Sequence, residues 1–234
     1  MTDGAADDLD QLLRRADPDR WLTSRFIGDD QARADVVALY LFDHELARAR
    51  RAASSSLLAE IRLTWWREAL DEIYGGRPAR RHPVAEALAG ALARRAVPRA
   101  LLEAMIDGYI AALDAASSDE EAVLVRAADA VQGSAAEAAA LMLDPATLDG
   151  LARSSGRAWG LALLLRAGLV PSGSIRTVLV ASLYQAREAA RSLSAAALPA
   201  ALPARLARFD LRGRTPGPIV ARLALMSAVL TGRI

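Results

Sequence analysis

The sequence predicts an all-α protein built as a single domain, and three observations lead to that prediction. Apolar residues make up 53% of the 234 residues while aromatic residues make up only 5%, so alanine and leucine, which favour helices, must build the core. No run rich in Val, Ile and Thr alternates as a strand would. The linkers between helical segments are short, so we expect residues 1–234 to form one domain.

Signals for helix ends place the individual helices. His82-Pro83 and Asp144-Pro145 each fit an N-cap followed by proline, Ser117 with Glu120 fits a capping box, and Gly75-Gly76 is typical of a helix stop. No helix is predicted before residue 30, and residues 1–16, acidic and rich in Gly and Ala at their start, are expected to be flexible. The predicted helices span residues 30–52, 56–74, 83–96, 98–116, 119–143, 145–169, 171–194, 199–210 and 217–231.

The helix predicted over residues 56–74 carries two apolar stripes. They consist of Leu58, Ile61 and Trp65 on one side and of Leu63, Trp66, Leu70 and Ile73 on the other. Two stripes indicate a helix that is buried on more than one side. We therefore expect this helix at the centre of the bundle, with its tryptophans as core anchors or, alternatively, as part of a cavity wall.

Composition and charge exclude several classes of protein. The 29 basic residues, all Arg, are balanced by 28 acidic residues to a formal net charge of +1, so we expect no nucleic-acid partner. The absence of Cys excludes disulfides and thiolate sites, and two histidines, His44 and His82, are too few for a histidine metal cluster. The first ten residues do not fit a signal peptide, and no apolar run approaches the roughly 20 residues that span a bilayer. A cytoplasmic protein is expected, with peripheral membrane contact as an open alternative.

Four segments, in one order along the chain, carry a resemblance to a known family. They are Arg20 to Phe26 with Ala38 to Phe42, then Glu60 to Leu70, then Ile106 to Gly108, and finally Gly156 to Trp159 with Leu164 to Arg166. Together they resemble the squalene/phytoene synthase family. The resemblance implies an isoprenoid-synthase-like helical bundle around a deep central cavity, in which active members join two prenyl diphosphates head to head using magnesium.

That reaction needs carboxylates, and the chain departs from the family at the positions that supply them. Mg²⁺ neutralises the pyrophosphate when carboxylates from facing helices hold it, and two Asp four residues apart share one helix face. The positions matching the first cluster are Ala47, Arg48, Ala49, Arg50 and Arg51, those matching the second are Ala167 to Pro171, and the third acid is replaced by Ala112. We therefore expect loss of prenyl transfer, with no catalytic residue and no resident metal.

One subgroup of the family fits better. The run from Phe42 to Ala47 and the sequence Trp65-Trp66-Arg67 are similar to phytoene-synthase-like proteins that act in the assembly of respiratory complex I. This similarity implies a non-catalytic protein whose partner is a complex I subunit or assembly protein, or an isoprenoid-like or quinone-like lipid. It also allows a peripheral location on the inner membrane. The alternatives are an active Mg-dependent prenyltransferase of the phytoene or squalene synthase type, and a plain scaffold without a ligand.

The resemblance also implies candidate residues for binding a ligand or partner at the inherited cavity. They are His44, Glu45, Arg48, Arg51, Trp65, Arg157 and Arg166. The arginines at 48, 50 and 51 are able to hold an anion directly, but a solvated face or a salt-bridge network is the favoured interpretation. The segment from Pro218 to Ile234 is either the last helix of the bundle or a helix that lies on a membrane or partner.

Overall fold

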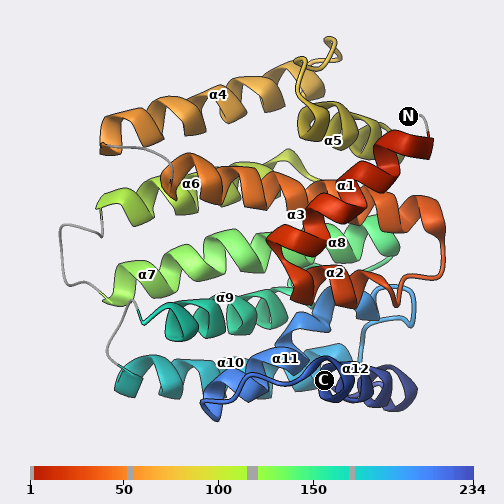
Figure 1. Cartoon of the computed structure of the whole chain (residues 1–234), viewed down its shortest axis with the longest axis vertical. Helices are drawn as coiled ribbons and strands as arrows, with labels where there is room; N and C mark the ends of the chain where they lie inside the picture. Colours follow the sequence, from red (N-terminus) through yellow and green to blue (C-terminus); the bar gives the residue numbers. More distant parts are fainter. Residues whose placement is uncertain (1–2, 52–54, 115–120, 169–171) are drawn as a thin grey trace.

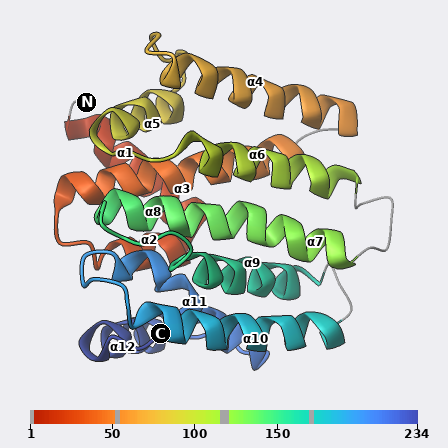
Figure 2. The same ribbon diagram turned by 180° about the vertical axis from the view of Figure 1, so that it is seen from behind.

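The computed structural model describes residues 3–51, 55–114, 121–168 and 172–234, and this part of the chain is all helical. Figures 1 and 2 show the helices stacked in layers along the long axis, from α4 and α5 at one end to α10, α11 and α12 at the other. The helices are α1 (Asp3–Ala16), α2 (Pro18–Ser24), α3 (Asp30–Arg51), α4 (Ser56–Tyr74), α5 (Pro83–Arg94), α6 (Arg99–Asp114), α7 (Glu121–Ala128), α8 (Ser134–Leu143), α9 (Arg153–Ala167), α10 (Ser172–Ala190), α11 (Pro203–Leu211) and α12 (Pro218–Thr231), with a π-helical segment at Asp129–Gly133 and a 3-10 helix at Leu198–Ala201. The predicted fold class is confirmed.

The centre of the bundle is α3. Every residue from Asp35 to Asp43 is buried, because α1, α4, α5, α6 and α8 all pack around this helix. The uninterrupted apolar run Val36 to Phe42 suits this position, since a helix surrounded on all sides has no need of a polar face.

The prediction that α4 is central is wrong. Leu63, Trp66 and Leu70 are buried against α3 and α6, but Leu58 and Ile61 are 42% and 56% exposed. Both apolar stripes exist in the sequence, yet only one meets a neighbour because α4 lies in the outermost layer (Figure 1). Trp65 is half-buried against the edge of Trp66, with ring centroids 4.9 Å apart.

The N-terminal segment is also different from the prediction, because residues 3–16 form α1 instead of a flexible start. Leu9 and Leu13 bury their side chains where α1 packs on α3. Asp17 then caps α2 by accepting a hydrogen bond from the Arg20 amide at 2.9 Å.

The predicted helix ends have mixed outcomes. His82-Pro83 begins α5, and α4 stops before Gly75 and Gly76, the second of which has φ of +71°. Asp144-Pro145 does not begin a helix: Asp144 follows α8, its carboxylate accepts from the Ala146 amide at 2.9 Å, and α9 starts only at Arg153. An Asp-Pro pair fits a turn as well as the start of a helix, and for this reason the helix predicted to begin at residue 145 is wrong. Ser117 and Glu120 lie outside the described residues.

The helix formed by α7, the π-helical segment and α8 crosses the middle of the molecule, and α9 packs very closely on it (Figure 2). A Cβ on Gly156 would lie 1.9 Å from the carbonyl oxygen of Gln132, and one on Gly160 would lie 3.0 Å from the Cβ of Ala128. Glycine at these positions lets α9 approach the backbone of the π turn directly, which fixes Gln132 in the interior.

Candidate functional site

A buried cluster of polar side chains lies where α2, α3, α6 and the π-helical segment meet. Asp43 is 2% exposed and accepts from all three neighbours: Tyr109 Oη donates to Oδ1 at 2.8 Å, while Arg20 Nη2 and Gln132 Nε2 donate to Oδ2 at 2.5 and 2.9 Å. Arg20 Nη1 also donates to Gln132 Oε1 at 3.1 Å, and Arg20 Nε donates to Asp17 at 2.5 Å. The cluster ties four segments of the chain together.

The carboxylates in this cluster stabilise the charge of Arg20 and keep the hydroxyl of Tyr109 protonated. Burial lowers the pKa of Arg20, but the charges of Asp17 and Asp43 together raise it by more. The pKa of Arg20 therefore lies above its usual value. Burial, followed by the charge of Asp43, raises the pKa of Tyr109 well above its usual value. Because both oxygens of Asp43 accept hydrogen bonds from Tyr109, Arg20 and Gln132, this carboxylate is part of the internal framework of the bundle.

A cavity of about 140 Å³ lies beside the cluster, between α3, α6, α7 with its π-helical continuation, and α9. One wall is polar and carries Arg50, Tyr109 and Gln132. The remaining lining residues are small or apolar, and they are Gly108, Ala112, Leu124, Ala127, Ala128, Val131, Gly160, Leu163 and Leu164.

Two of the positions at which the family is expected to carry acids meet at this cavity. Arg50 lies in the segment matching the first acidic cluster, and its Nη2 donates to the carbonyl oxygen of Ala112, the third replaced position, at 3.3 Å. Ala167, from the second cluster, is exposed at the end of α9. These residues do not fit a magnesium ion, because a guanidinium and methyl groups replace oxygen ligands there. Among the residues that the structure describes, no group of three or more Asp, Glu or His side chains is arranged to hold a metal.

The seven residues predicted for binding do not line this cavity. On α3, Glu45 is buried and accepts from Arg48 at 3.0 Å, whereas Arg48 and Arg51 are exposed. His44 is half-buried, and burial lowers its pKa despite the neighbouring Glu45. Their role in contacting a partner stays a prediction, but these four form a group on the last turns of α3.

The other three predicted residues lie apart from that group. Trp65 sits on α4, with the Arg80 guanidinium 5.1 Å from its ring centroid. Arg157 donates to Ser182 at 3.1 Å and to Gln185, and Arg166 holds Asp210 at 2.8 Å and Asp19 at 3.1 Å. Both arginines therefore tie α9 to its neighbours, and any role in binding a partner remains untested.

The residues that form the cluster are not among the predicted site residues. Arg20 and Tyr40, whose ring lies 4.8 Å from the Arg20 guanidinium, fall within segments that resemble the family, but no polar role was assigned to them. One signal was present: Asp43 directly follows the apolar run Val36 to Phe42, and a charged residue at that place in a central helix requires a partner. Gln132 carried no comparable signal.

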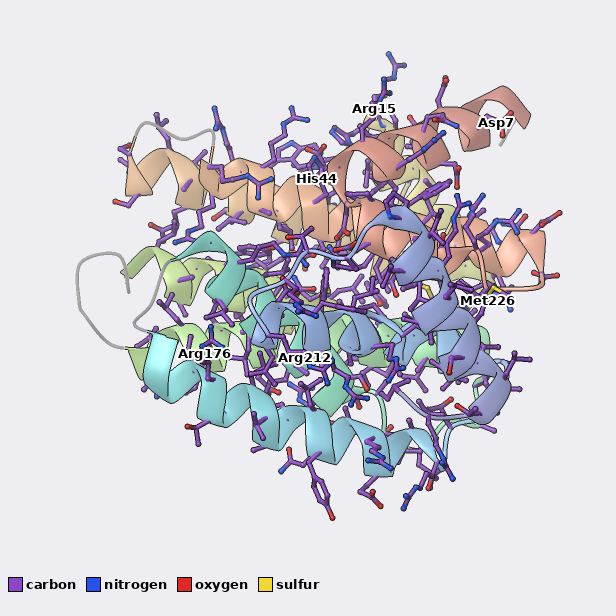
Figure 3. The ribbon with its side chains drawn as sticks, turned by 60° about the horizontal axis from the view of Figure 1, so that its bottom comes forward. Asp7, Arg15, His44, Arg176, Arg212 and Met226 are labelled. Carbon is purple, nitrogen blue, oxygen red and sulfur yellow. The ribbon has the colours of Figure 1, made fainter. Side chains whose placement is uncertain are left out.

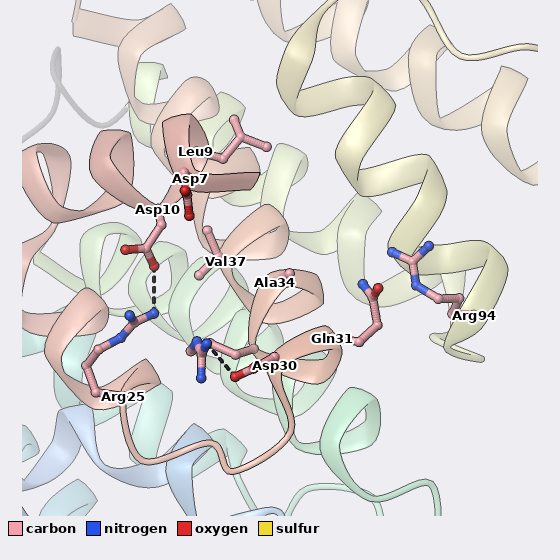
Figure 4. Close-up of a pocket in the computed structure, with 10 residues that line it drawn as sticks. Asp7, Leu9, Asp10, Arg25, Asp30, Gln31, Ala34, Val37 and Arg94 are labelled. Atoms are coloured by element: carbon pink, nitrogen blue, oxygen red, sulfur yellow. Dashed lines mark hydrogen bonds and ion pairs between the residues drawn. The ribbon is translucent and has the colours of Figure 1, made fainter. Parts of the chain in front are cut away.

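A larger hollow lies elsewhere, on the surface between α1, the start of α3 and α5 (Figure 4). It measures about 550 Å³ and is lined mainly by charged side chains. Four of those charges are paired within the wall, since Arg25 binds Asp10 and Arg33 binds Asp30, each at 2.6 Å. Arg94 binds the buried Asp35 at 2.6 Å, so most of the charges at this hollow already have partners.

The arrangement of helices around a central polar cluster and cavity is that of an isoprenoid-synthase-like protein. A crystal structure of a dehydrosqualene synthase in complex with a ligand superimposes with a TM-score of 0.74, covering 97% of this chain and 96% of that chain at 13% identity. The family model for squalene/phytoene synthase matches residues 13–168. The chain therefore belongs to the squalene/phytoene synthase family. Among curated proteins no significant match is found.

No helix in the part of the chain that the structure describes is long and apolar enough to cross a membrane.

Proposed function

We propose that the protein is a non-catalytic member of its family that acts in the assembly of respiratory complex I by binding a partner protein. The observation that carries the loss of catalysis is the contact between Arg50 and the carbonyl oxygen of Ala112 at the central cavity. A guanidinium at this place repels Mg²⁺, whereas prenyl transfer requires carboxylates that gather it.

The size of the cavity favours a protein partner over a bound lipid. Pockets for small-molecule ligands usually measure about 300–1,000 Å³, and this cavity measures about 140 Å³. An isoprenoid-like or quinone-like lipid would have to open it by moving α9 away from α6. The second candidate function, lipid binding, is supported by the pairing of a cationic wall at Arg50 with apolar residues such as Leu163 and Leu164. Mass spectrometry of an organic extract of the purified protein distinguishes the two, because only a lipid carrier releases an isoprenoid.

The end of the molecule formed by α4 offers a surface for such a protein. Leu57, Leu58 and Ile61 are 64%, 42% and 56% exposed on the first turns of α4. Leu57 and Leu58 lie four and three residues before Ile61, so both are its neighbours on the helix surface. Contiguous exposed apolar residues are typical of protein interaction sites. The assembly role itself rests on the similarity of Phe42 to Ala47 and Trp65 to Arg67 to the complex I assembly subgroup.

Deletion of the gene is expected to lower respiratory complex I activity while squalene and carotenoid levels stay unchanged. Complementation then tests the arginines of α3: reversing Arg48, Arg50 and Arg51 to Glu should fail to restore complex I if they face an acidic partner. The matched control is the same reversal at Arg15, Arg191 and Arg214, which are exposed, lie away from α4 and change the total charge equally. Normal complex I activity in the deletion strain removes the assembly role.

Purified protein supplied with farnesyl or geranylgeranyl diphosphate and Mg²⁺ is expected to release no pyrophosphate above a control without protein. The physical reason is that the positions for metal ligands hold Ala47, Arg48, Arg51, Ala112 and Ala167. A coupled pyrophosphate assay measures the release directly. Turnover that disappears when an acidic residue is substituted would show that the chain is an active prenyltransferase.

A further inference from the structure

The charge of the chain is divided unevenly along its length, although the whole is nearly neutral. Residues 151–234 contain 12 arginines and only two acidic residues, Glu188 and Asp210, whereas residues 1–150 contain 17 arginines and 26 acidic residues. The described part of the basic section forms α9 to α12, with α10, α11 and α12 at one end of the long axis (Figure 1). The protein therefore has one strongly basic end, and such an end orients a protein toward an anionic surface.

Several arginines at this end converge on two adjoining hollows, which we call the basic basin. Arg187, Arg205, Arg208 and Arg233 line one hollow of about 310 Å³, and Arg205, Arg208 and Arg212 line another of about 120 Å³. Burial, with repulsion from the neighbouring Arg205, Arg212 and Arg187, lowers the pKa of Arg208. Cations gathered in this way are stabilised by an external anion.

Among the described residues, no Asp or Glu side chain lines the basin. Asp210, the acidic residue of α11, is already held by Arg166 on the other side, at 2.8 Å. None of the five basin arginines forms an ion pair with a described carboxylate, in contrast to Arg166 and Arg153, each of which holds two. The basin arginines are thus available for an anion from outside.

Beside the basin, α12 presents an exposed apolar stripe. Ala221, Leu225 and Ala228 face the protein, and the opposite side of the helix is apolar as well. The outer stripe consists of Ile219 (73% exposed), Leu223 (59%), Met226 (49%) and Leu230 (81%). Their spacing of four, three and four residues sets them in one line. A helix that is apolar on both sides is stable when both sides are covered.

The stripe and the basin adjoin each other, so a single surface is able to engage both. Ser227 and Thr231, which follow Met226 and Leu230 in the sequence, line the basin from the side of α12. Figure 3, with this end of the molecule turned forward, shows α10 and α12 on the same face, with Met226 on α12 and Arg212 in the segment that follows α11.

We propose that α12 and the basic basin form a docking surface for a bilayer containing anionic lipid. The outer stripe of α12 lies in the headgroup region, and the basin arginines bind lipid phosphates, as in other interfacial helices that combine an apolar face with flanking cations. A second copy of the chain fits this face less well, because two-fold pairing would bring the two sets of basin arginines together. This docking goes beyond the proposed assembly role and does not depend on it.

Flotation with vesicles tests the proposal, using phosphatidylcholine alone and phosphatidylcholine mixed with about one third phosphatidylglycerol. The wild-type protein is expected to bind the anionic vesicles and to dissociate at high salt. Replacing Arg205, Arg208 and Arg212 with Gln should weaken binding roughly 100-fold, because each basic residue near an anionic surface contributes about a factor of five. The matched control replaces Arg62, Arg77 and Arg81 with Gln, which lowers the charge equally and should leave binding unchanged.

A second pair of variants tests the apolar stripe separately. Leu223→Gln with Leu230→Gln should weaken binding at least about tenfold, while Leu57→Gln with Leu148→Gln, also at exposed leucines, should not. Equal binding to both kinds of vesicle, or wild-type binding by the Arg205, Arg208 and Arg212 variant, overturns the proposal. So does a wild-type dimer that binds no vesicles and becomes monomeric in the stripe variant, since α12 would then be a self-association surface.

Discussion

Gly156→Ala is expected to destabilise the protein by at least about 3 kcal/mol, or to prevent it from folding. The added methyl group would lie 1.9 Å from the carbonyl oxygen of Gln132 and 2.5 Å from its carbonyl carbon. These are backbone atoms, so no change of rotamer relieves the clash, and α9 would have to move away from the π turn. Equilibrium unfolding in urea, followed by circular dichroism, measures the change.

The matched control is Gly173→Ala. Gly173 is an exposed residue of α10, and no atom lies within 4 Å of the position that its Cβ would take. Alanine here restricts the unfolded chain and favours the helix, so we expect a gain of about 0.4–1 kcal/mol. If Gly156→Ala is as stable as the wild-type protein, α9 does not approach the π turn as closely as the structure places it.

Most helices could be predicted from the sequence, because their end signals and apolar periodicity are local. Their placement could not. The apolar stripes of α4 were read correctly, but Leu58 and Ile61 are exposed because no element packs on that side. Periodicity reports which side of a helix is apolar, whereas the presence of a neighbour depends on the whole fold. The segment from Asp3 to Ala16 was missed for the opposite reason: many charged residues surround the few leucines that anchor it.

The candidate site was predictable only in part. The replaced acidic positions were found from the resemblance, because they follow recognisable segments. The contact of Arg50 with Ala112 and the partners of Asp43 were not, since residues 62 and up to 89 positions apart in the chain form them. Such pairs arise because α3 packs on α6, which in turn packs on the π-helical segment, and no local pattern encodes them.

The interior of the bundle contains a buried acidic residue, Asp43, and several positions at which acidic residues are replaced. Asp43 remains in the centre, but it is an internal acceptor for Arg20, Tyr109 and Gln132. The acids that would face the cavity are absent from the matching positions, and Arg50 reaches across it instead. An interior of this kind keeps the bundle of the family with alanine and arginine at the positions that match its acidic clusters.

Arg20→Met is expected to destabilise the protein by about 3–5 kcal/mol, because it leaves Asp43 charged in the interior without its cationic partner. Arg80→Met is the matched control. Both arginines hold two carboxylates and lie over an aromatic ring, Tyr40 for Arg20 and Trp65 for Arg80. The side chain of Asp43 is 2% exposed, whereas those of Glu68 and Glu72 are 57% and 21% exposed, so the loss at Arg80 should be only about 1 kcal/mol.

A double-mutant cycle with Asp43→Asn then isolates the interaction between Arg20 and Asp43. Asparagine keeps the size of the side chain and removes the charge, so Arg20→Met in that background no longer leaves a buried carboxylate without its cation. We expect the second substitution to cost at least about 1.5 kcal/mol less than it does in the wild-type protein. Urea unfolding of the four proteins provides the free energies. Equal losses for Arg20→Met in both backgrounds would mean that Asp43 is stabilised by Tyr109 and Gln132 alone. Equal losses for Arg20→Met and Arg80→Met would mean that burial adds nothing to the pairing of α2 with α3.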